Sequence, residues 1–101
     1  MRNQSLWEIL VPVRWSNGLI IDVERHKEWD KRCREISNGM TILRPAKGFW
    51  NNEGEEHIEE MLPVRLLADE EQIRKLAYFT KEFYRQTQVM FYKLSDEVYF
   101  V

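Results

Sequence analysis

Two amphipathic helical stretches, set among strand-like stretches, restrict the fold of this chain more than any other feature of its sequence. Residues 6–15 carry Trp, Ile or Val at every second position, which predicts a strand. The turn residues Ser16-Asn17-Gly18 follow it. Asp22 then favours the start of a helix whose apolar residues recur every three or four positions as far as Ile36, before Asn38-Gly39 ends it.

The second half of the chain predicts a hairpin, a helix and a last strand, and no internal repeat is present. Residues 40–50 and 58–68 flank Asn51-Asn52-Glu53-Gly54, where Gly54 suits the left-handed position of a hairpin turn. Asp69 and Gln72 have the spacing of a capping box, and the apolar stripe beyond them predicts a second helix. Residues 89–94 predict a last strand.

The order β-α-β-β-α-β predicts an α+β, ferredoxin-like two-layer sandwich formed by residues 1–101 as a single domain. In that fold a four-stranded antiparallel sheet carries two helices on one face, and the first and third strands are central. Pro12, Pro45 and Pro63 conflict with regular central strands, because proline donates no ladder hydrogen bond. Either the strands bulge there or the strand order differs.

Charge and composition exclude several classes of protein. The 101 residues include 15 Lys and Arg against 17 Asp and Glu, a net charge of −2, so no basic surface for nucleic acid is expected. No apolar run approaches the ~20 residues of a membrane-spanning helix. Cys33 is the single cysteine, and no export signal precedes it, which favours a reducing compartment, the cytoplasm.

The outward face of the two central strands is apolar but contains no aromatic residue on which bases could stack. It presents Leu10, Pro12, Met61, Pro63, Arg65 and Leu67. No helix of so short a chain remains to cover Leu10, Met61, Leu67 and the neighbouring Leu43, so we expect this face to form the interface of a homodimer or to bind a protein partner. Nucleic acid and membrane are not expected partners.

Chemistry-bearing residues are sparse. In an acidic run, a strand would place His57 and Glu59 on one face, and Arg65 and Tyr92 are further candidates for a catalytic site. Two ligands from one strand are too few for a metal site, so neither a metal nor another cofactor is expected. His26 is interpreted as a partly buried packing residue, and Cys33 as a core residue.

From Ile36 onward the chain resembles a bacterial family of small domains of unknown function. The likeness rests on Asn38-Gly39-Met40-Thr41-Ile42-Leu43, Gly48-Phe49-Trp50, the acidic residues from Glu55 to Glu59, and Tyr84-Arg85-Gln86-Thr87-Gln88-Val89-Met90. It covers roughly two-thirds of the chain, residues 36–101. The resemblance implies a ferredoxin-like fold and no assigned chemistry.

Two functions therefore stay open. The first is a non-enzymatic interaction domain that self-associates through its sheet face. The second is a small cofactor-independent enzyme or ligand-binding protein of the dimeric α+β barrel type, with a pocket between helices and sheet. A cavity that holds His57 or His26 together with Arg65, Tyr92 or a carboxylate would favour the second.

Overall fold

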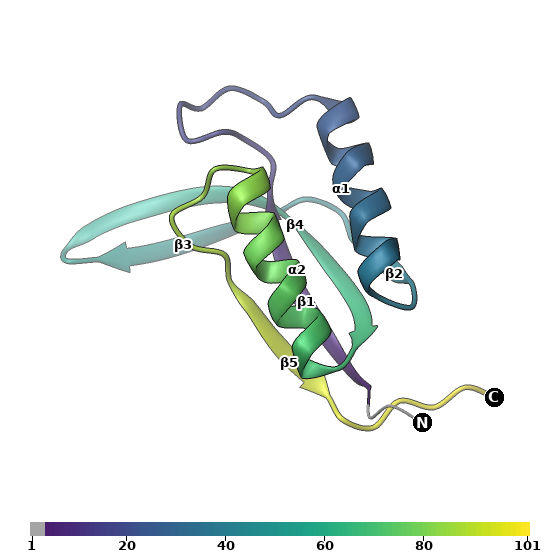
Figure 1. The fold of residues 1–101 in the computed structure, drawn as a ribbon. Helices are drawn as coiled ribbons and strands as arrows, with labels where there is room; N and C mark the ends of the chain where they lie inside the picture. Colours follow the sequence, from purple (N-terminus) through teal and green to yellow (C-terminus); the bar gives the residue numbers. More distant parts are fainter. Residues whose placement is uncertain (1–3) are drawn as a thin grey trace.

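The computed structural model describes residues 4–101. Their strands and helices follow in the order β1 (Ser5–Pro12), α1 (Val23–Ile36), β2 (Met40–Ile42), β3 (Ala46–Asn52), β4 (Glu55–Ala68), α2 (Glu70–Phe83) and β5 (Phe91–Ser95). The strands form one antiparallel sheet in the order β2-β4-β1-β5, and β3 pairs with the first half of β4. Both helices lie on one side of the sheet (Figure 1). The predicted α+β two-layer sandwich, with β1 and β4 at its centre, is confirmed.

The number of strands differs from the prediction. The expected strand 40–50 divides into β2 and β3, so the sheet contains five strands instead of four. Residues 43–45 separate the two pieces, and Pro45 among them has no backbone donor to continue a ladder. The first strand also ends at Pro12 and not at Trp15 as expected.

The prolines of the two central strands mark neither a bulge nor a different strand order. The pairing of β1 with β4 runs unbroken from Ser5 opposite Ala68 to Pro12 opposite Met61. The Pro63 carbonyl accepts a hydrogen bond from the Leu43 amide at 2.9 Å, one residue beyond the end of β2. Pro63 has no N–H with which to donate a second hydrogen bond to the Leu43 carbonyl, so the β2–β4 ladder ends there.

The core lies between the helices and the sheet face turned towards them. Its buried side chains include Trp7, Ile9, Val11, Trp29, Cys33, Val64, Leu66, Ile73, Leu76 and Tyr84. The predicted capping box is present at the start of α2: the Asp69 carboxylate accepts from the Gln72 amide at 2.8 Å, and the Gln72 side chain accepts from the Asp69 amide at 2.9 Å. This cap fixes where α2 begins above the sheet.

A long two-stranded hairpin extends beyond the helices (Figure 1). It consists of β3, the first six residues of β4 and the turn between them, residues 46–60, and is called the arm below. The predicted turn is confirmed, with Glu53 and Gly54 both at positive φ. Phe49 and Ile58 face each other across the arm and are 63% and 62% exposed. No helix of residues 4–101 is long and apolar enough to cross a membrane.

Candidate functional site

The sheet face turned away from the helices is called the open face. Since side chains alternate along a strand, the residues opposite in phase to Trp7, Ile9 and Val64 lie on it. Register pairs Leu6 with Leu67, Glu8 with Arg65 and Leu10 with Pro63 across β1 and β4. The open face therefore has apolar residues above and below one charged pair.

Glu8, Arg65 and Tyr92 form a polar cluster across three strands of the open face. Arg65 donates from Nε to Glu8 Oε1 at 3.0 Å, and the Tyr92 hydroxyl donates to Glu8 Oε2. Glu8 itself is only 7% exposed. Both of its carboxylate oxygens already accept hydrogen bonds, so Glu8 has the partners of a structural ion pair and is not placed to act as a general base.

Two of the predicted site residues thus meet, through a third that sequence reasoning missed. Arg65 and Tyr92 were candidates, and Glu8 joins them because β1 lies between β4 and β5. The sequence contained one indication of this role. Glu8 is the one acidic residue of a strand otherwise rich in apolar residues, and such a residue needs a partner when it is buried.

The other two candidates, His57 and Glu59, lie elsewhere, on the arm. His57 is eight residues from Arg65 along β4, which corresponds to about 26 Å of extended strand. Its Nε2 atom lies 3.8 Å from Oε2 of Glu55, and it faces Trp50 on β3. Among residues 4–101, no three His, Cys, Asp or Glu side chains gather closely enough to hold a metal ion.

The four predicted interface residues are not equally accessible. Leu10 and Leu67 lie on the open face and are partly exposed, as is Leu43 beside Pro63. Met61 is only 7% exposed, and its methyl group lies against Gly48 of β3, 2.5 Å from where a Cβ atom on that residue would be. Met61 therefore packs within the base of the arm.

His26 lines a small cavity of about 110 Å³ between α1 and the sheet, together with Asp30. Its Nδ1 atom lies 2.7 Å from the Tyr84 hydroxyl. Burial lowers the pKa of His26, which the nearby Asp30 and Asp22 carboxylates partly oppose, and burial raises the pKa of Asp30. The partly buried position predicted for His26 is confirmed.

Cys33 is fully buried on the face of α1 that is turned towards the core, as predicted for a core residue. Burial raises the pKa of its thiol to about 11, although the Ser37 hydroxyl lowers it in part. A thiol with such a pKa is almost entirely protonated near neutral pH and is a poor nucleophile.

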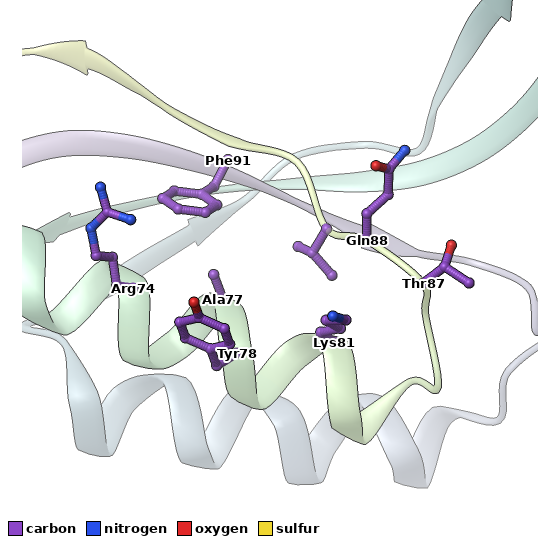
Figure 2. Close-up of a pocket in the computed structure, with 8 residues that line it drawn as sticks. Arg74, Ala77, Tyr78, Lys81, Thr87, Gln88 and Phe91 are labelled. Atoms are coloured by element: carbon purple, nitrogen blue, oxygen red, sulfur yellow. The ribbon is translucent and has the colours of Figure 1, made fainter. Parts of the chain in front are cut away.

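Sequence reasoning missed a groove of about 210 Å³ between α2 and the segment that leads into β5. Figure 2 shows Arg74, Tyr78 and Lys81 on α2, with Gln88 and Phe91 across the groove from them. No periodic pattern predicts it, because it depends on how closely the segment of residues 87–91 packs back against α2.

Comparison with known proteins rests on structure. A scan of family models and a search of curated proteins found no match. Among solved structures, CutA1 from a psychrotrophic Shewanella species aligns with a TM-score of 0.72 at 9% identity, over 97% of this chain and 85% of that protein. The divalent cation tolerance protein CutA1 from Thermus thermophilus aligns with a TM-score of 0.68 at 16% identity, over 90% and 82%. The chain has the CutA1 fold.

Other structures agree with this assignment of the fold. The periplasmic divalent cation tolerance protein CutA from Archaeoglobus fulgidus aligns with a TM-score of 0.65 at 16% identity, over 90% of this chain and 81% of that one. The CutA1 fold is ferredoxin-like, as the order of elements predicted. At these identities the likeness concerns the fold alone, and the resemblance to the bacterial family of unknown function stays a prediction.

Proposed function

We propose that this protein is a self-associating interaction module that forms a homodimer through its open face. One observation carries the proposal: apart from the Glu8–Arg65 pair, both central strands are apolar on both faces, and both helices cover the same face. Apolar residues on both faces are typical of a sheet that is buried on both sides. A second copy can supply the missing cover.

The chemistry of the open face suits a copy of itself. Leu10 and Leu67 each gain roughly 1.5–3 kcal/mol when moved from full exposure to full burial, and their present partial exposure reduces that gain. The charges of Glu8 and Arg65 cancel within one chain, so an apposed copy meets no net repulsion there. A two-fold axis would bring identical patches together, the commonest arrangement of soluble dimers.

We further propose that the protein works in the cytoplasm. The free Cys33, buried and without a disulfide partner, is compatible with a reducing compartment. One protein of the same fold is described as periplasmic, so the fold by itself does not assign this protein to the cytoplasm. Fractionation of the native source with an antibody against this chain tests the proposal.

The cavity beside His26 favours a second candidate, a small ligand-binding protein or cofactor-independent enzyme. A histidine and a carboxylate line the same space, which is the arrangement that distinguishes this function. Its volume of about 110 Å³ is well below the roughly 300 Å³ at which pockets for drug-sized ligands begin. Two-dimensional NMR during titration with imidazole-sized and carboxylate fragments tests it, with shifts at His26 expected only if the cavity takes a ligand.

Light scattering coupled to gel filtration tests the homodimer. We expect the unsubstituted protein to have the mass of a dimer at micromolar concentration and Leu10→Glu to have the mass of a monomer, since a charge at the interface centre opposes burial. Leu19→Glu is the matched control, because Leu19 is an exposed leucine outside the sheet. A monomer mass for the unsubstituted protein at high micromolar concentration would contradict the proposal.

A further inference from the structure

The groove between α2 and β5 lies beside an unpaired strand edge. β5 pairs with β1 along one edge only, and no other strand of residues 4–101 pairs with β5. The Met90 carbonyl accepts from the Leu10 amide at 3.1 Å. Since alternate residues of an antiparallel strand direct their backbone groups to opposite sides, the N–H and C=O of Phe91 point away from β1. They are free to receive an added strand.

The groove combines an apolar floor with a cationic rim. Ala77, Val89 and Phe91 contribute the apolar side chains. Arg74 and Lys81 stand two helical turns apart on α2 and flank the groove, as Figure 2 shows. The Arg74 guanidinium is already paired with Glu70 at 3.0 Å, so Lys81 carries the uncompensated positive charge of the rim. The groove therefore suits an extended segment that carries apolar side chains next to an acidic one.

The chain itself contains such a segment. Residues 98–101, Val-Tyr-Phe-Val, follow β5 without belonging to a strand or helix, although all four residue types favour strands. Tyr99 and Phe100 are 80% and 83% exposed. Glu97 precedes them and supplies the negative charge. Large side chains in water on a strand-prone segment are typical of an unoccupied docking element.

We propose that residues 98–101 of a second copy add as a strand to the free edge of β5 and place an apolar side chain in the groove between α2 and β5. Glu97 of that copy then lies near the cationic rim formed by Arg74 and Lys81. This is strand addition, in which backbone hydrogen bonds provide affinity and a neighbouring pocket provides specificity.

We assign the segment to the groove of another copy because residues 98–101 cannot reach the groove of their own chain. The groove is lined by residues 87–91, at the start of β5, whereas the segment leaves the opposite end of that strand. Figure 1 shows it running on, away from the groove. To return along β5 the chain would use Asp96 and Glu97 to reverse its direction, and the four residues that remain span about 13 Å, less than the roughly 16 Å of the five residues of β5.

This inference concerns a surface other than the open face. It shares with the proposed function only the premise that the protein self-associates. Each copy carries both the segment and the groove, so two copies can exchange segments reciprocally about a two-fold axis. The open-face contact can exist without the exchange, and the exchange without the open-face contact.

Cysteine cross-linking between two variants of the full chain tests the exchange. Tyr78→Cys places a thiol at the groove, and Phe100→Cys places one on the segment; Cys33 does not interfere, being fully buried. After the two variants are mixed and oxidised with diamide, we expect a disulfide-linked heterodimer in high yield. Lys27→Cys mixed with Phe100→Cys is the matched control, because Lys27 is exposed on α1. An equal yield in the control, or no link in either mixture, would overturn the exchange.

A charge swap and an open-face variant sharpen the result. We expect Lys81→Glu to lower the yield several-fold and Glu97→Lys in the other copy to restore it. A link that persists in a Leu10→Glu background shows that the exchange does not need the open face. If no link forms while light scattering still gives a dimer, the exchange is wrong and the proposed function stands.

Discussion

The two halves of β4 have opposite environments although they form one continuous strand. Residues 61–68 are mostly buried between β1, β2 and the helices, whereas all of residues 55–60 are exposed in the arm. The first half reads Glu-Glu-His-Ile-Glu-Glu and the second Met-Leu-Pro-Val-Arg-Leu-Leu-Ala. The boundary falls where β1 ends at Pro12, opposite Met61.

This difference indicates that the buried half of β4 contributes to stability much more than the exposed half does. The second half of β4 is held by the core. The arm has its own turn and the pairing of β3 with β4, and within residues 4–101 only its last residue, Glu60, is bound to the chain after β1, through the Val13 amide and the Arg14 side chain. An isolated two-stranded ribbon is marginally stable in water. Charged residues along the exposed half also discourage unwanted pairing of its edges. The core half should therefore dominate the free energy of unfolding.

The largest contrast is expected from the same kind of truncation in each half. Leu66→Ala should lower the free energy of unfolding by about 2–5 kcal/mol, because it leaves a cavity in the core. Ile58→Ala should change it by less than about 0.5 kcal/mol, because Ile58 is exposed on the arm. Urea denaturation followed by circular dichroism measures both. Equal losses would show that the arm is as tightly packed as the core.

The ion pair of the open face gives the next largest effect. Arg65→Met should cost about 1–3 kcal/mol, because it removes the charged partner of a carboxylate that is largely buried. Arg74→Met is the control, since its pair with Glu70 is exposed and should be worth less than about 0.5 kcal/mol. If the two substitutions cost the same in urea denaturation, the Glu8 cluster adds no more than a surface pair.

Gly48 tests the junction between the two halves. A Cβ atom there would lie 2.5 Å from Met61 Cε and 3.0 Å from the Trp50 ring, so Gly48→Ala must shift the end of the flexible Met61 side chain, at a cost of up to about 1 kcal/mol. Lys47→Ala, at the neighbouring exposed position of β3, should cost almost nothing. Thermal unfolding by calorimetry compares them. An unchanged melting temperature for Gly48→Ala would mean that Met61 moves freely.

A smaller, pH-dependent effect is expected at His26. Burial lowers its pKa in the folded state below 6.5, so the unfolded chain binds the proton more readily, and the free energy of unfolding falls as the pH drops through 6.5. Asp30, Asp22 and Tyr84 are the ionisable groups that face it. Denaturation at pH 7.5 and 5.5 should show a larger loss for the unsubstituted protein than for His26→Gln. Identical losses would exclude His26 as the source.

The fold followed from local patterns, and the sites did not. The period of two in residues 6–15 and the spacing of Asp69 and Gln72 each depend on neighbours in sequence, so the strands and α2 were predictable. Glu8 contacts Arg65 and Tyr92 across 57 and 84 residues, and such contacts depend on strand order and register. The division of the strand at Pro45 was indicated by the proline itself, although the sequence left its consequence open.

The most direct test of the account is an isotope-filtered NMR measurement of contacts between copies. In an equal mixture of carbon-13-labelled and unlabelled protein, the methyl groups of Leu10 and Leu67 should show intermolecular nuclear Overhauser effects. These residues lie on the open face of the two central strands, which the helices do not cover. The methyl group of Ala77 beneath the α2 groove should report segment exchange separately. Intermolecular contacts absent from Leu10 and Leu67 at millimolar concentration would contradict self-association through the open face.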